Sequence, residues 1–344
     1  MNPEPGERAI SVRKVLLFLL ILTMGGADSV MSEGKADESL NAKGYATEAA
    51  GHISIYDSVK DIVKHPAFKG FGEYLLPWDD NTNYYNTLLT DVGSLLPYHS
   101  HVNPGTVVGA LNHMIDEVND GRTIFFNFYS AQQKQQDPVK ASAGLFFFKG
   151  DPGAPFAVVC PGGGFAYVGS LHEGFPHALE LSNKGYNAFV LKYRAGSGTK
   201  ASEDLAAALS YIFQNAAMFE VGTKDYSLWG SSAGARMVGD VALHGSARWG
   251  GRDIPKPGAV IIAYTGHSSF SGTYPPTFIT VSEDDRIVSV PIVDKRVENL
   301  RNAGIEVEYR KYKSSGHGFG LGVGTDASGW LEHALLFWEK HMSK

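Results

Sequence analysis

The sequence has very little cysteine, since Cys160 is the single one among 344 residues. One thiol excludes an internal disulfide framework and a metal site built from several cysteines. An excess of one charge sign is also missing: 30 basic side chains stand against 36 acidic ones, and no block of like charges stands out. The charge pattern therefore argues against a nucleic-acid partner, and we expect Cys160 to be a small core residue.

A membrane-spanning run is missing as well. The apolar run Val15–Met24 is only about half as long as the roughly 20 residues that a spanning helix needs. Basic residues precede it and small residues follow it up to Ala27, which is the pattern of a secretory signal. We expect residues 1–27 to be a cleaved signal peptide and residues 28–44 a flexible linker. The mature protein would be secreted or periplasmic, without a stable membrane anchor.

The pattern of apolar and polar residues changes near residue 121. Residues 45–121 mix Pro- and Gly-containing loops with helical stretches at Ile53–Lys64 and Thr106–Asn119. We expect this part to be a mostly helical extension that packs on a catalytic domain, residues 122–344. In that domain apolar strands alternate with amphipathic helices, which predicts a mainly parallel sheet with helices on both faces. The predicted strands are Thr123–Tyr129, Gly144–Phe148, Phe156–Cys160, Asn187–Tyr193, Tyr226–Trp229, Ala259–Tyr264, Thr277–Val281 and Val307–Tyr312. The predicted helices are Phe175–Lys184, Ser202–Phe219 with Ser202 as N-cap, Ala233–Leu243, Val290–Asn302 and Trp330–His341.

The pentapeptide Gly230–Gly234 reads G-S-S-A-G and lies between a predicted strand and a predicted helix. That context is what a nucleophile elbow requires, because the turn is sharp and its flanking glycines avoid Cβ clashes. We therefore predict that Ser232 is a nucleophile exposed above the sheet. The competing interpretation is a glycine-rich turn that merely packs tightly.

A serine hydroxyl needs a base, and the base needs an orienting carboxylate. His317 is flanked by glycines just past the last predicted strand, so we predict that it is the base. The alternative is a loop histidine bonded to the backbone. Glu283, Asp284 and Asp285 directly follow the preceding strand. Only one of them should reach the imidazole; we prefer Asp285, with Asp284 next.

Three glycines follow the strand that ends at Cys160, in the run Pro161–Phe165. Such a loop can turn backbone N–H groups toward an oxyanion, as acyl transfer requires. The predicted donors are the N–H groups of Gly163, Gly164 and Ala233. The alternatives are a phosphate-binding loop or a plain turn; the sequence contains no G-x-x-x-x-G-K-[ST] motif.

Two further residues near this loop are candidates for substrate binding. They are Phe165 and Glu173; the alternative for Glu173 is that it only favours the first turn of a helix. His99 and His101 have a spacing at which two rings on a strand would share a face, but no third ligand is evident nearby. We therefore predict no metal and no cofactor.

These motifs resemble those of the α/β-hydrolase superfamily, and within it the bacterial carboxylesterases related to acetyl xylan esterases. The resemblance covers about residues 122–344 and includes the glycine loop, the elbow and the G-H-G-F at Gly316–Phe319. The family's G-x-x-D-x-x-V matches Ser282–Val288, which puts the acid on Asp285, although Ser282 stands where Gly is usual. The resemblance implies an α/β-hydrolase fold and a serine esterase for short-chain acyl groups, often acetyl on plant polysaccharides.

The expected partner is therefore a small-molecule or carbohydrate ester. Two other functions compete with this one. A serine peptidase of the prolyl-oligopeptidase type uses the same triad, but its long β-propeller domain does not fit before residue 122. A hydrolase-fold binding module without activity would not need all three triad residues in order.

Overall fold

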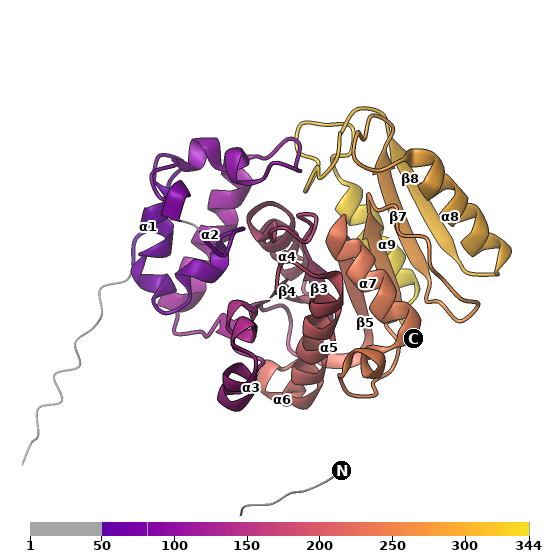
Figure 1. Ribbon diagram of the computed structural model, residues 1–344, viewed down its shortest axis with the longest axis horizontal. Coiled ribbons are helices and arrows are strands. Elements are labelled where there is room, and N and C mark those ends of the chain that lie inside the picture. Colours follow the sequence, from indigo (N-terminus) through magenta and orange to yellow (C-terminus); the bar gives the residue numbers. More distant parts are fainter. Residues whose placement is uncertain (1–49, 81, 344) are drawn as a thin grey trace, which may run out of the picture. The chain divides into compact units, whose positions relative to one another are not determined.

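A computed structural model describes residues 50–80 and 82–343 of the chain (Figure 1). They fall in one compact unit. The predicted signal peptide and linker lie outside the described residues. Within the described ranges, no helix is long and apolar enough to cross a membrane.

The centre of the molecule is a sheet whose strand order is β1-β2-β4-β3-β5-β6-β7-β8. β1 and β2 are antiparallel at one edge, and all pairs from β4 to β8 are parallel. The central strands are buried along nearly their whole length, as expected for a parallel sheet covered on both faces. The strands are β1 Phe125–Phe126, β2 Gly144–Phe148, β3 Pro155–Cys160, β4 Asn187–Lys192, β5 Gly222–Ser231, β6 Ala259–Ala263, β7 Thr277–Ser282 and β8 Val307–Tyr312.

Helices cover both faces of this sheet, which confirms the predicted fold class. α5 packs against α7, and α4 packs near α9, where the ring of His177 meets that of Trp330 at 5.5 Å (Figure 1). The α-helices are α1 Val59–Val63, α2 Pro104–Asn119, α3 Ala131–Gln136, α4 Phe175–Asn183, α5 Gly198–Gln214, α6 Ala216–Phe219, α7 Ala233–His244, α8 Val290–Asn302 and α9 Trp330–Lys340. Short 3-10 or π turns are η1 Pro66–Phe68, η2 Gly72–Leu75, η3 Thr82–Tyr84, η4 Leu89–Leu95, η5 Pro138–Ser142, η6 Ser170–Gly174 and η7 Ser246–Trp249.

Most predicted elements have somewhat different bounds in the structure; β5, for example, runs from Gly222 to Ser231 and not from Tyr226 to Trp229. α5 begins at Gly198 because the Ser197 hydroxyl, not that of Ser202, accepts from a backbone N–H of the first turn. Ser202 lies buried inside the helix. The first helix is shortened to α1, which starts after the capping box of Ser58 and Asp61. The predicted strand Thr123–Tyr129 shrinks to the two residues that pair with β2.

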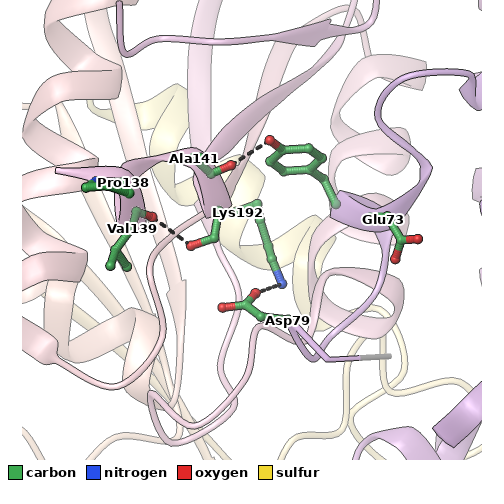
Figure 2. Close-up of a pocket in the computed structure, with 8 residues that line it drawn as sticks. Glu73, Asp79, Pro138, Val139, Ala141 and Lys192 are labelled. Atoms are coloured by element: carbon green, nitrogen blue, oxygen red, sulfur yellow. Dashed lines mark hydrogen bonds and ion pairs between the residues drawn. The ribbon is translucent and has the colours of Figure 1, made fainter. Parts of the chain in front are cut away.

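The N-terminal segment, residues 50–80 and 82–121, is built of helices and turns, with an isolated bridge between Ser58 and Leu88. It is fastened to the sheet by a buried lysine at the end of β4. Lys192 Nζ donates to the carbonyls of Leu76 and Pro77 at 2.9 and 3.0 Å, and it lies 3.4 Å from Asp79 (Figure 2). Lys192 and Asp79 line one side of a hollow of about 410 Å³. The segment therefore belongs to the same compact unit as the sheet.

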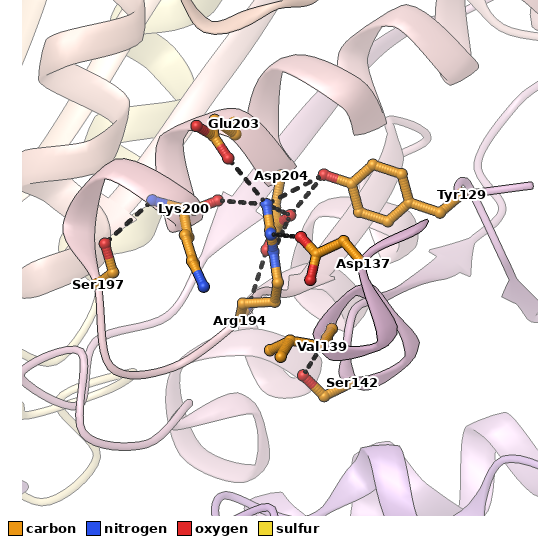
Figure 3. Close-up of polar contacts among 9 residues, drawn as sticks. All are labelled: Tyr129, Asp137, Val139, Ser142, Arg194, Ser197, Lys200, Glu203 and Asp204. Carbon is orange, nitrogen blue, oxygen red and sulfur yellow. Dashed lines mark hydrogen bonds and ion pairs between the residues drawn. The ribbon is translucent and has the colours of Figure 1, made fainter. Parts of the chain in front are cut away.

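A second buried cation joins the chain around α3 to the start of α5. Arg194 is 1% exposed and its guanidinium contacts the carboxylates of Asp137, Glu203 and Asp204 at 2.8–3.1 Å (Figure 3). Asp204 is fully buried and also accepts from the Tyr129 hydroxyl at 2.6 Å. Each buried charge therefore has several partners, which offsets the cost of its removal from water.

We predict that Arg194→Met strongly destabilises the fold. The substitution removes the main partner of the buried Asp204 carboxylate, so the free energy of unfolding should fall by about 3–5 kcal/mol. Arg310→Met is the matched control, because its ion pair with Glu308 is partly exposed to solvent, and it should cost about 1 kcal/mol or less. Urea unfolding of the three proteins measures both values. If both variants lost equally little free energy of unfolding, the buried ion pairs of Arg194 would not contribute to stability as predicted.

Candidate active site

Ser232 occupies a strained turn between β5 and α7. Its backbone has φ 50° and ψ −114°, a conformation that a non-glycine residue rarely adopts. A Cβ at Gly234 would lie 1.9 Å from the carbonyl oxygen of Cys160, and one at Gly230 would lie 2.5 Å from Ala235. Both flanking positions therefore require glycine, and the turn presents the Ser232 hydroxyl at the start of α7.

The structure brings the three predicted triad residues into one hydrogen-bonded series. The Ser232 hydroxyl lies 2.9 Å from His317 Nε2, and His317 Nδ1 lies 2.8 Å from Asp285 Oδ2. The side chains of Asp285 and His317 are 0% and 4% exposed. Nδ1–H can therefore donate to the carboxylate, which leaves Nε2 free to accept from the serine hydroxyl.

Asp285 is the acidic residue that reaches the imidazole, and Asp284 has a different place. Asp285 Oδ1 accepts from the N–H groups of Ile287 and Val288, both at 2.8 Å. Asp284 instead joins the two loops, because its Oδ1 accepts from the Ser282 hydroxyl at 2.6 Å and from the N–H of Gly316 at 2.8 Å. The bond from Ser282 is the main reason that the pKa of Asp284 is lowered. Glu283 is exposed.

The glycine loop after β3 lies directly beside the nucleophile. Gly163, Gly164 and Phe165 have φ of 126°, 65° and 58°, so the backbone turns sharply over three successive residues. A Cβ at Gly162 would lie 3.0 Å from Ser232 Cβ. In the described part of the chain, the N–H groups of Gly163, Gly164 and Ala233 meet no acceptor. These three N–H groups thus belong to two segments that meet at the serine, which is the arrangement that an oxyanion hole uses.

Phe165 and Glu173 differ in their surroundings. Phe165 is half-buried with its ring 6.0 Å from that of Tyr193, and its contact with substrate stays a prediction. Glu173 is fully buried, so the predicted role in lining the pocket is wrong. One of its oxygens accepts from the N–H of Gly162 at 2.6 Å, and the other accepts from the Tyr264 hydroxyl at 2.7 Å. The turn η6 directs this carboxylate beneath the glycine loop and away from solvent.

His99 is a site residue that the sequence did not reveal as such. It comes from the N-terminal segment, its side chain is 2% exposed, and its Nε2 lies 3.2 Å from Glu173. Its Nδ1 lies 2.9 Å from the Tyr167 hydroxyl. Burial by itself raises the pKa of the Glu173 carboxyl, but contacts with His99 and Tyr264 outweigh this and hold that pKa below its usual range. His101 is exposed at φ 55°, so the two histidines do not share a face.

Comparisons with known proteins match parts of this chain. A family model described as BD-FAE matches residues 149–249, which include the glycine loop and the elbow. An acetylxylan esterase of Xylanibacter ruminicola is 25% identical over 210 residues, 52% of this chain and 43% of the relative. Endo-1,4-beta-xylanase B of Butyrivibrio fibrisolvens is 36% identical over 93 residues, 25% of this chain and 14% of the relative. The chain thus spans less than half the length of these two relatives.

Solved structures share the fold at low identity. An α/β hydrolase from a Medee basin deep-sea metagenome library has a TM-score of 0.51 and 24% identity, over 58% of this chain and 92% of that one. An acetyl ester-xyloside bifunctional hydrolase of Caldicellulosiruptor lactoaceticus has a TM-score of 0.51 and 21% identity, over 58% and 88% of the two chains. The chain therefore has the α/β-hydrolase fold, and about half of it is similar in sequence to an acetylxylan esterase.

A hollow of about 310 Å³ opens beside the imidazole of His317. One wall comes from the N-terminal segment and the other from the loops that follow β7 and β8. The lining residues are Pro97, Tyr98, His99, Ser100, His101, Asp284, Arg286, Ile287, Gly316 and His317.

The lowered pKa of the buried Glu173 carboxyl predicts how the stability of the fold depends on pH. A carboxyl whose pKa is lower in the fold than the ordinary value of 4.5 stabilises the fold fully above pH 4.5. That contribution is lost as the pH falls below 4.5 toward the folded value. Glu173→Gln should therefore cost more stability at pH 7 than at pH 3.5. The difference between wild type and variant should shrink by about 1.4 kcal/mol over the first pH unit below the unfolded pKa.

Urea unfolding at the two pH values measures this effect. Glu180→Gln is the matched control, because Glu180 is exposed on α4, and it should change stability little at either pH. The same loss at both pH values for Glu173→Gln would mean that the buried carboxyl is already protonated in the fold.

Proposed function

We propose that the protein is an exported serine carboxylesterase that hydrolyses short-chain acyl esters, acetyl above all, on carbohydrate or other polar alcohols. The observation that carries the proposal is the series Ser232–His317–Asp285 beside three free backbone donors. The relation to acetylxylan esterases supports ester hydrolysis as the reaction. Export rests on residues 1–27, outside the described part of the chain.

In the proposed mechanism, Ser232 Oγ attacks the ester carbonyl while His317 Nε2 takes the hydroxyl proton. Negative charge develops on the carbonyl oxygen, and the N–H groups of Gly163, Gly164 and Ala233 stabilise it. The imidazolium that forms is stabilised by the buried Asp285 carboxylate. His317 then gives its proton to the departing alcohol oxygen, and the acyl group stays on Ser232.

The second half of the reaction uses the same groups. A water molecule enters beside His317. His317 takes a proton from this water as the water oxygen attacks the acyl-enzyme carbonyl. The oxyanion again lies against the backbone donors, and its collapse releases the acid and restores the Ser232 hydroxyl. No other group of the chain is needed for either half.

The proposed preference for a short acyl group rests on the limited space near the triad. The chain between Asp285 and His317 holds one helix, α8, and one strand, β8, and no apolar insertion that could serve as a lid. The N-terminal segment approaches the site through Pro97–His101, which is mainly polar. A long acyl chain needs an apolar cleft, because each buried CH₂ contributes roughly 0.8 kcal/mol.

The first prediction of this proposal concerns the triad. Ser232→Ala should lower kcat by about 10⁶ because the triad acts as a unit. Asp285→Asn should lower it by about 10⁴, since the imidazole loses its orienting acceptor. Hydrolysis of p-nitrophenyl acetate by the purified variants measures these losses, and a fluorophosphonate label should attach to Ser232 in the wild type alone.

Two neighbours provide matched controls for the triad series. Ser231→Ala and Asp284→Asn change the adjacent residue of the same type, and each should cost far less than its partner substitution. Near-normal turnover in Ser232→Ala with an inactive Ser231→Ala would move the nucleophile by one residue. A larger loss at Asp284 than at Asp285 would overturn the assignment of the acid.

The second prediction concerns the acyl chain. Over p-nitrophenyl esters from acetate to dodecanoate, kcat/KM should be highest at acetate and fall as the chain lengthens, because no apolar cleft receives the added methylenes. The ratio of kcat/KM for successive esters measures the trend. A maximum at about eight carbons or longer would point to a lipase-like enzyme with a buried acyl groove.

A further inference from the structure

The segment Pro97–His101 joins the two loops that flank Ser232, although it lies outside the matched residues 149–249. The N–H of Ser100 donates to the carbonyl of His317 at 2.9 Å and lies 3.2 Å from that of Gly318. The N–H of Tyr98 donates to the Tyr167 hydroxyl at 3.0 Å. Backbone contacts therefore hold this segment in place without the Tyr98 side chain.

The Tyr98 ring lies against the oxyanion loop. Its nearest carbon would be 2.9 Å from a Cβ at Gly164, so the absence of a side chain there makes room for the ring. One face stacks on Tyr167, with ring centres 5.6 Å apart and planes 23° apart. The residue is nevertheless 44% exposed, and it lies at the edge of the hollow.

The chemistry of the proposed reaction places the alcohol of the ester in this hollow. His317 must give its proton to the departing oxygen, so that oxygen lies beside the imidazole and the rest of the alcohol extends from there. The hollow of about 310 Å³ is lined by His317 and Gly316 on this side. Its other walls offer the exposed polar side chains of Arg286 and His101.

We propose that this hollow is the alcohol-side subsite for a sugar residue and that Tyr98 is its stacking platform. A sugar ring has apolar C–H faces and a hydroxyl-bearing edge. Its face can lie on the open part of the Tyr98 ring, while its hydroxyls meet the polar groups of Arg286 and His101. The proposal rests on the proposed esterase function and names the class of alcohol. Tyr98 is a specificity-determining residue that takes no part in acyl transfer.

The test compares two acetyl esters that differ only in their alcohol. Acetylated xylotriose offers sugar rings to the hollow, whereas the alcohol of ethyl acetate is too small to reach Tyr98. Tyr98→Ala should raise KM for acetylated xylotriose by about tenfold, the size of one aromatic contact. The same variant should keep kcat/KM for ethyl acetate within about twofold of wild type, because the triad is intact. Acid release at constant pH measures both rates.

Two further variants separate stacking from support of the loop. Tyr98→Phe keeps the ring and should keep the wild-type KM for acetylated xylotriose. Tyr56→Ala removes an exposed tyrosine of the N-terminal segment that does not line the hollow, and it should leave both substrates unaffected. Thermal unfolding of each variant checks that the fold is retained.

The outcomes distinguish this proposal from the function on which it rests. If Tyr98→Ala lowered kcat/KM equally for both esters, the ring would only support the loop. If the KM for acetylated xylotriose were unchanged, the sugar would not bind against Tyr98 in the hollow. Either result overturns the subsite and leaves the esterase intact. A wild-type protein that hydrolyses neither ester, and whose Ser232 takes no fluorophosphonate label, refutes the esterase and the subsite together.

Discussion

The buried carboxylate of Glu173 is the contact on which the rest of the site depends. It holds the N–H of Gly162 below the glycine loop, and it accepts from Tyr264, whose ring lies 5.1 Å from that of His317. Its third partner is His99 at 3.2 Å. A charge removed from water is tolerated only with such partners. One side chain thus connects the glycine loop, the N-terminal segment and, through Tyr264, the ring of His317.

The N-terminal segment is therefore part of the site and not an appendage to the hydrolase fold. Lys192 fastens it to the sheet, His99 supports the glycine loop from below, and Ser100 bonds to the loop that carries His317. The same segment supplies Tyr98 to the rim of the hollow. The segment lies outside the family match at residues 149–249, and we propose that it contributes to the choice of alcohol.

The sheet could be predicted well because each central strand is an apolar run bounded by turn residues, and burial on both faces demands that pattern. β2 and β8 have the predicted bounds, as does α8.

The first residues of the helices were predicted less accurately than the strands. Ser197 and Ser202 are both good N-cap residues, and the choice depends on where the chain leaves β4 for the face of the sheet. The Ser58–Asp61 capping box likewise lay inside an apparently continuous helical stretch.

The sequence by itself determined the elbow at Ser232, since the constraint is local: a strained serine between two glycines, after a strand and before a helix. It also singled out His317 between its glycines. The Ser282–Val288 motif favoured Asp285 over Asp284, but only the tertiary structure shows which carboxylate reaches the imidazole: Asp284 meets the backbone of Gly316, and Asp285 meets the ring of His317. The same holds for Glu173 and His99, whose partners lie far away in sequence. Contacts between distant loops depend on how the sheet and the N-terminal segment pack, and no local pattern encodes them.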